Sequence, residues 1–106
     1  MKIYRGTLEE TDLGGRVVLV NPGPLQYRLN PRFDLYNHSP TGFMWGYGGS
    51  GPAQLALAIL ADLLGDDTQA LMLYQPFKWK VIATLPMGED WELTGDDVHE
   101  FIRKVA

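Results

Sequence analysis

The chain has 106 residues and no cysteine, and its 13 Asp and Glu against 9 Lys and Arg give a formal charge of −4. This size and a hydrophobic content of 45% predict one domain, residues 1–106, while the missing cysteines exclude disulfides, thiolate metal sites and a cysteine nucleophile. We expect a cytoplasmic protein with neither nucleic acid nor membrane as a direct partner, because the charge is acidic and no apolar run approaches a membrane span.

The N-terminal part of the chain is expected to form a small antiparallel sheet. Residues 2–8 and 16–20 are rich in β-branched and aromatic side chains, and the glycines of residues 13–15 separate them, which is the pattern of a hairpin. A turn at residues 21–24, in which a glycine can supply a positive φ, leads to a third strand at residues 25–30. Apolar residues alternate along this strand, so one face should be buried. That face would carry Leu25, Tyr27 and Leu29.

A long loop and a buried helix follow the sheet. The segment 31–51 is rich in Pro, Gly, Asn and Ser but also carries several aromatic residues, so we expect an ordered loop anchored by buried rings. Pro52 suits the first position of a helix, with one of the two residues before it as the cap. Residues 53–64 are apolar almost throughout, which predicts a buried central helix, and Gly65 is placed to end it.

A second helix is predicted after this glycine. Residues 66–68 can cap it, and apolar residues at spacings of three or four continue as far as Leu85. Pro76 lies inside the segment and predicts a kink, while a competing interpretation makes residues 78–85 a strand, because apolar residues also alternate there. The expected inward face consists of Ala70, Tyr74, Phe77, Val81 and Leu85.

The C-terminal segment completes the predicted fold. Residues 91–93 are expected to form a connector, and Thr94 is expected to cap a last helix that ends near Val105. Its inward residues would be Val98, Phe101, Ile102 and Val105. The fold class is therefore α+β: a three-stranded antiparallel sheet packed on a buried central helix, with two further helices.

The most distinctive motif is the glycine-rich segment 46–51, which leads into the central helix. Such glycines let backbone amides approach an anion at a helix N-terminus, which suits a phosphate cradle. The alternative is that they serve tight turns and close packing, and the sequence leaves both interpretations open. A dinucleotide fold needs a parallel sheet for which too few residues follow residue 51, and no Lys-Ser or Lys-Thr pair completes a P-loop.

The candidate ligand-binding residues lie in and around this segment. A phosphate would need a cation near the amides, and a base would need an aromatic face. Gln54 could bind a ligand or satisfy loop carbonyls, and Lys78 could lie at the mouth of the glycine loop or on a solvated face. The full set is Arg28, Arg32, Trp45, Gly46, Tyr47, Gly48, Gly49, Ser50, Gly51, Gln54 and Lys78.

No arrangement of residues predicts catalysis, a metal or a cofactor. His38 and His99 are far apart in the sequence, so a catalytic pair is disfavoured. The carboxylates of residues 96–100 are expected to favour the positive end of a helix dipole rather than to bind a metal. A small hydrolase or transferase that uses His38 with a loop hydroxyl is kept only as a minor alternative.

A long motif in the middle of the chain resembles a known family. Residues 39–43 read Ser-Pro-Thr-Gly-Phe, and residues 45–56 read Trp-Gly-Tyr-Gly-Gly-Ser-Gly-Pro-Ala-Gln-Leu-Ala. With Leu-Tyr-Gln and Phe-Lys within 73–78, and Trp91 and Leu-Thr within 91–94, they resemble a family of small uncharacterised proteins of bacteria, archaea and their phages. The resemblance implies no catalytic residue, and the occurrence in phages suggests a role in counter-defence.

Two hypotheses for function follow. The leading one is a non-enzymatic protein that sequesters a phosphate-bearing small molecule at residues 46–54, with a nucleotide-derived signal as the expected ligand. This would resemble, by functional analogy, the phage sponge proteins that sequester nucleotide immune signals. The rival is a protein-interaction module that inhibits a host protein through exposed aromatic residues. An interface between identical copies is also compatible with the aromatic content.

Overall fold

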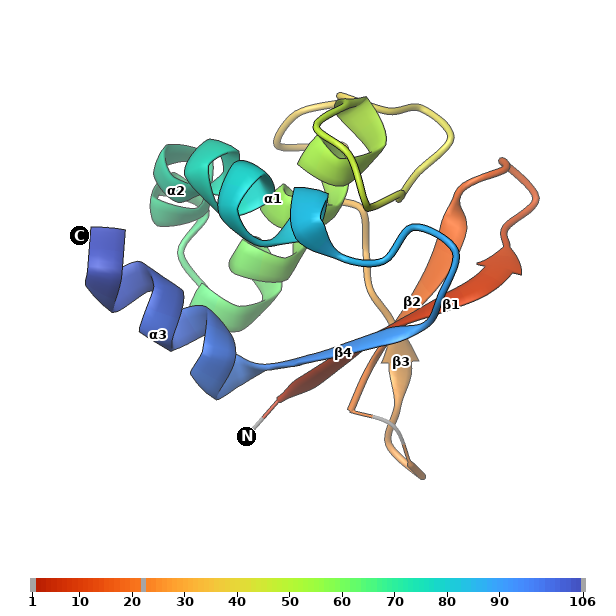
Figure 1. Ribbon diagram of the computed structural model, residues 1–106, viewed down its shortest axis with the longest axis horizontal. Helices are drawn as coiled ribbons and strands as arrows, with labels where there is room; N and C mark the ends of the chain where they lie inside the picture. The colour runs from red at the N-terminus through yellow and green to blue at the C-terminus, as the bar shows by residue number, and fades with distance from the viewer. Residues whose placement is uncertain (1, 22, 106) are drawn as a thin grey trace.

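The computed structural model describes residues 2–21 and 23–105, and its fold is α+β, as expected. Within these residues an antiparallel sheet of four strands in the order β3-β2-β1-β4 lies to one side of three α-helices (Figure 1). The elements in chain order are β1 (Ile3–Glu10), β2 (Arg16–Val20), β3 (Tyr27–Arg28), α1 (Ser50–Leu64), α2 (Asp67–Lys80), a 3-10 turn (Ile82–Thr84), β4 (Trp91–Thr94) and α3 (Gly95–Val105).

The prediction of three strands is wrong, because the expected connector at residues 91–93 belongs to a fourth. Strand β4 pairs antiparallel with β1, from Ile3 opposite Thr94 to Gly6 opposite Trp91. Gly6 makes this pairing feasible, since a side chain there would collide with the indole of Trp91. A strand this short, paired with the opposite end of the chain, leaves little periodicity for a sequence pattern to report.

The third strand is also shorter than predicted. Only Tyr27 and Arg28 pair with β2, and of the three residues expected to be buried, Leu29 is buried while Leu25 and Tyr27 are exposed. The strand lies at the edge of the sheet, where only one side offers backbone partners. Within the predicted turn, Gly23 has the expected positive φ of 137°. The remaining turn prediction at Pro22 lies outside the described residues.

The central buried helix is confirmed as α1. Its residues from Gly51 to Ala61 are all buried, most of them belong to the hydrophobic core, and α1 packs along α2. It begins earlier than predicted, at Ser50 with Gly49 as the N-cap, and ends at Gly65, whose φ of 63° is the left-handed conformation that glycine adopts readily. Neither this helix nor any other in the described part of the chain is long and apolar enough to cross a membrane.

Helix α2 stops at Lys80, five residues before the predicted end, and the alternative of a strand at residues 78–85 is wrong. The chain continues into the 3-10 turn, whose Ile82 is buried. At the other end of α2, the Asp66 carboxylate accepts a hydrogen bond from the backbone amide of Gln69, so the predicted cap is confirmed. The buried residues of α2 are Ala70, Tyr74, Phe77 and Lys78.

Helix α3 is capped as expected but buries less than expected. The Thr94 hydroxyl accepts a hydrogen bond from the Asp97 amide at 3.1 Å, and the Asp97 carboxylate accepts one from the Thr94 amide at 3.0 Å, which is a reciprocal capping arrangement. Val98 is fully buried, and Phe101 and Ile102 pack half-buried against the core. Val105 is exposed, contrary to prediction, because the last turn extends beyond the core.

Candidate functional site

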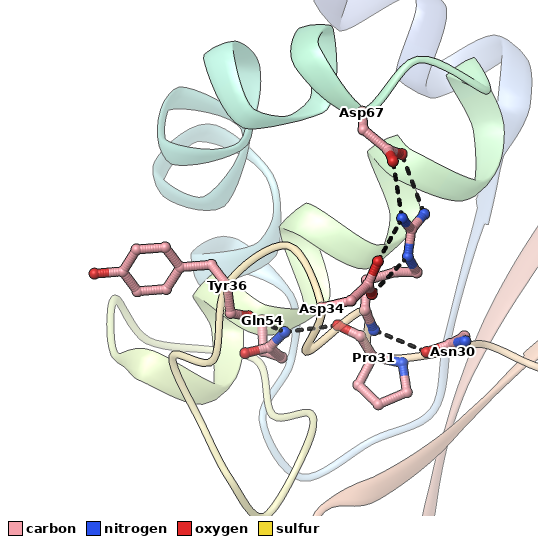
Figure 2. A network of polar contacts seen from close by, with 7 residues as sticks. Asn30, Pro31, Asp34, Tyr36, Gln54 and Asp67 are labelled. Carbon is pink, nitrogen blue, oxygen red and sulfur yellow. Dashed lines mark hydrogen bonds and ion pairs between the residues drawn. The ribbon is translucent and has the colours of Figure 1, made fainter.

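The long loop before α1 is held in place by one buried side chain, Gln54. Its carboxamide oxygen accepts hydrogen bonds from the amides of His38 (2.8 Å) and Ser39 (3.2 Å). Its nitrogen donates to the carbonyls of Pro31 (2.6 Å) and Tyr36 (3.0 Å), as Figure 2 shows. All four positions are on the loop, so Gln54 satisfies loop backbone, which is one of the two roles the sequence left open for it.

A second clamp attaches the same loop to α2. The Arg32 guanidinium forms hydrogen-bonded ion pairs with Asp34 (3.0 Å) and Asp67 (2.9 Å), and Figure 2 labels both aspartates and marks these contacts with dashed lines. These hydrogen bonds, first that of Asp34 and then that of Asp67, raise the pKa of Arg32. The backbone of Arg32 has a φ of 57°, and its amide donates to Asn30 Oδ1. Arg32 therefore lies in a structural clamp, away from the glycine segment.

Trp45, a predicted aromatic platform, lies in the core. Its ring is fully buried, its indole nitrogen donates to the Pro86 carbonyl at 2.9 Å, and Trp91 packs edge-on against it at 5.5 Å. The Arg16 guanidinium lies over the ring at 4.8 Å from its centroid, and it also donates to the Met87 carbonyl. The buried Trp45 side chain holds the start of the glycine segment in place. It has no free ring face on which a ligand could stack.

The glycines of the segment are approached closely by the protein's own side chains. A side chain on Gly46, which has a φ of 88°, would collide with Met87, and one on Gly51 would collide with Met44. On the outer surface, the Trp79 ring lies against Gly48 and the Tyr47 ring lies against Gly49. The glycines of this segment therefore allow close packing of neighbouring side chains. On the solvent side, aromatic rings pack against the backbone of the segment. Tyr47 and Trp79 are 43% and 59% exposed.

Lys78 lies at the mouth of the glycine segment, which is one of the two positions that the sequence left open for it. Its Nζ is 3.4 Å from the Gly48 carbonyl oxygen and 4.3 Å from the centroid of the Trp79 ring, and the residue is only 7% exposed. Within residues 2–21 and 23–105, no carboxylate lies within ion-pair distance of this ammonium group. The N-cap of α1 nearby is Gly49, which has no side chain to accept a hydrogen bond from the first-turn amides, and Ser50, the first residue of α1, is exposed.

His38 lies beside this cation. Its ring stacks on Tyr36 at 4.2 Å between centroids, and its Nε2 is 2.6 Å from the Tyr74 hydroxyl. Burial, followed by the charge of Lys78, lowers the pKa of His38. The neutral imidazole is therefore the form that this site favours.

This shift makes stability depend on pH. Because the pKa of His38 is lower in the folded chain than the ordinary value of 6.5, the unfolded chain binds a proton first as the pH falls. We expect the free energy of unfolding to decrease below that pH, by at most about 1.4 kcal/mol per pH unit, and to level off below the folded pKa. Free energies of unfolding measured by chemical denaturation across this pH range should change less with pH in His38→Gln than in the original protein. The exposed His99, changed to Gln, should keep the original slope; equal slopes in both variants would contradict the assignment.

A cavity of about 420 Å³ lies elsewhere, between the turn that joins β1 to β2, strand β2 and the loop. Arg28 lines it, and none of its lining residues belongs to segment 46–51, so the structure separates Arg28 from Lys78. Sequence analysis missed this cavity because its walls come from segments far apart along the chain. Its lining residues are Thr11, Asp12, Leu13, Arg16, Val17, Val18, Arg28, Leu29, Asn30, Pro31, Phe33, Thr41, Gly42 and Phe43.

Comparison with protein families identifies one match, described as "Family of unknown function (DUF6166)", over residues 4–104. The chain belongs to this family. The match covers β1 through α3, so the clamped loop, the glycine segment and Lys78 all fall within the family domain. No curated protein and no solved structure matches the chain.

Proposed function

We propose that the protein binds and sequesters a phosphate-bearing small molecule, with a nucleotide-derived signal as the expected ligand. The site comprises the Lys78 ammonium group, the exposed rings of Tyr47 and Trp79, and the backbone from Gly48 to the first turn of α1. Binding of this kind needs no nucleophile and no cofactor, and we propose a non-enzymatic role. We propose counter-defence as the context, because the family that the central motif resembles includes proteins of phages as well as of bacteria and archaea.

The observation that carries this proposal is the environment of Lys78. Lys78 as a whole residue is only 7% exposed, and a cation withdrawn from water costs free energy unless a negative charge compensates it. The described residues offer its ammonium group only the Gly48 carbonyl and the face of Trp79. The N-terminus of α1, with Gly49 as its cap, adds a partial positive charge near the same place. In a chain of net charge −4, this local concentration of positive charge favours an anionic ligand.

The aromatic side chains complete the argument for a nucleotide. Tyr47 and Trp79 lie against Gly49 and Gly48, so their outer faces are presented to solvent beside the cation. A nucleobase stacks on such faces with about 1–3 kcal/mol per base. A phosphate at Lys78 and a base on an adjacent ring would together give an affinity that neither contact provides alone.

The test compares two lysines of the same helix. A thermal-shift and calorimetry panel of inorganic phosphate, mononucleotides, cyclic dinucleotides and ADP-ribose should yield a ligand that, at a hundredfold excess over Kd, raises Tm by about 10 °C. We expect Lys78→Gln to weaken that ligand about tenfold or more, which would remove about half of the rise in Tm. Lys80→Gln, with the same change in charge at an exposed position, should leave the affinity unchanged.

Two results would contradict the proposal: no member of the panel stabilises the protein, or Lys78→Gln and Lys80→Gln reduce the affinity equally. The second result would mean that the anion responds to overall charge rather than to this site. Gly49→Val offers an independent check, since its side chain would displace the ring of Tyr47 and so should reduce binding of the nucleotide.

One observation favours a second candidate function, a protein-interaction module that inhibits a host protein. Met87, 46% exposed, packs against Gly46, so together with Tyr47 and Trp79 it forms an exposed apolar surface around the glycine segment. Under this candidate, Trp79→Ala abolishes capture of a protein partner in a pull-down, and Lys78→Gln leaves capture largely intact. Ligand-induced stabilisation that depends on Lys78 would favour the first function instead.

A further inference from the structure

The cavity beside β2 has fixed walls. Backbone hydrogen bonds join the hairpin turn to the loop, from the Gly15 amide to the Thr41 carbonyl (2.9 Å) and from the Arg16 amide to the Phe43 carbonyl (3.0 Å). On the other side, the Leu29 amide donates to a carbonyl of β2 at 2.8 Å. Since these bonds hold all three segments together, the cavity is preformed, and a ligand would not have to order it.

The interior of the cavity is mainly apolar. Phe43 and Leu29, which are buried, reach it from the core, and Val17 contributes a buried side chain that is not part of the main core cluster. At the rim, Leu13 is 63% exposed although it lines the same cavity. A volume of about 420 Å³ is within the range of small-molecule sites, and an apolar ligand would remove the exposed surface of Leu13 from water.

One cation is available at the rim. The guanidinium of Arg28 has Glu9 as its ion-pair partner at 4.0 Å, and both side chains are about two-thirds exposed, so this pair is weak. The other lining arginine, Arg16, is already engaged with the Trp45 ring and the carbonyl of Met87.

The carboxylate of Asp12 also lines the cavity. The Arg28 guanidinium, held only by its weak pair with Glu9, lies at a rim that also carries Asp12, and this mixture of charges favours a ligand with one negative charge over a doubly charged phosphate. A guanidinium matches a carboxylate in a planar, two-point hydrogen bond. The cavity therefore differs in chemistry from the proposed phosphate site at Lys78.

We propose that this cavity is a second small-molecule site, which binds a compact monocarboxylate with an aromatic or branched apolar body. The apolar body lies against Leu29, Phe43 and Leu13, and the carboxylate meets Arg28 at the rim. This site shares no residue with the site around Lys78, so the two proposals can be tested independently of each other.

The test uses 4-phenylbutyrate as a probe of the full chain and follows backbone amides by NMR. Addition of the probe should shift the amides of Gly15, Thr41, Phe43 and Leu29, which line or adjoin the cavity. Arg28→Gln should weaken the probe about tenfold. Arg5→Gln is the matched control, because Arg5 is also exposed and pairs with a carboxylate at 4.0 Å, but it does not line the cavity.

Two further comparisons separate the parts of the proposal. The neutral analogue 4-phenyl-1-butanol should bind more weakly than 4-phenylbutyrate, and its affinity should not change in Arg28→Gln. Leu13→Ala, a change at an exposed position that should not disturb folding, should weaken both probes severalfold. Lys78→Gln should leave the binding of both probes unchanged.

Three outcomes would overturn the proposal: no amide around the cavity shifts at millimolar probe, the shifts cluster elsewhere on the chain, or Arg28→Gln and Arg5→Gln weaken 4-phenylbutyrate equally. Failure of nucleotide binding at Lys78, with 4-phenylbutyrate still bound and sensitive to Arg28, would leave this proposal intact and remove only the proposed function.

Discussion

Gln54→Leu is expected to lower the free energy of unfolding by about 3 kcal/mol. The substitution retains an apolar body of similar size but removes four hydrogen bonds from a side chain with 0% exposure. Two loop amides and two loop carbonyls then lose their partner, and each unsatisfied buried group costs about 1–3 kcal/mol unless water reaches it. Four such groups would cost about 4 kcal/mol at the lower end of this range, and partial rearrangement of the loop toward solvent reduces the expected loss to about 3 kcal/mol.

Urea denaturation with linear extrapolation measures this loss, and hydrogen exchange localises it. The amides of His38 and Ser39, which donate to Gln54, should lose protection before those of α1. Gln75→Leu is the matched control, because Gln75 is exposed on α2 and its replacement should change stability by less than about 0.5 kcal/mol. Equal effects of the two substitutions would show that Gln54 does not anchor the loop.

Asp62→Ala is expected to destabilise the protein by a similar amount, about 3 kcal/mol. Asp62 lies on α1, and its carboxylate accepts hydrogen bonds from the hydroxyls of Tyr4 (2.6 Å) and Tyr27 (2.8 Å) and from Lys2 Nζ (3.1 Å). It therefore ties β1 and β3 to the central helix. Tyr4 is fully buried, and burial followed by the Asp62 carboxylate raises the pKa of its hydroxyl, which would be left without this acceptor in the variant.

The control for this prediction is an aspartate that pairs with a cation at the surface. Asp90→Ala removes the partner of Arg5, at 4.0 Å and half exposed, and should cost less than about 0.5 kcal/mol. Asp62→Asn, which keeps one acceptor oxygen, should lose less stability than Asp62→Ala. If Asp62→Ala and Asp90→Ala had equal denaturation midpoints, the Asp62 carboxylate would not hold the strands to the central helix as described.

Local sequence patterns determined the parts of the fold that depend on near neighbours. The apolar run after residue 52 indicated the buried helix α1, and Gly65 ended it in the expected left-handed conformation. Asp66 and Thr94 capped the next two helices as predicted, because a cap involves residues only three positions apart. Sequence also indicated, without deciding, that Lys78 could lie at the glycine segment.

Only the tertiary structure decided which distant residues meet. Pairing of β4 with β1 joins the two ends of the chain, and periodicity reports which face of a strand is apolar but never its partner. For the same reason the sequence could not choose between a ligand and the loop backbone for Gln54, nor place Arg28 at a cavity whose walls come from three segments. The sequence by itself determined the presence of the helices and the caps at Gly65, Asp66 and Thr94 through local hydrogen bonding and periodicity. The tertiary structure alone determined the pairing of β4 with β1, the contacts of Gln54 and Arg32 and the walls of the cavity, because these depend on long-range packing.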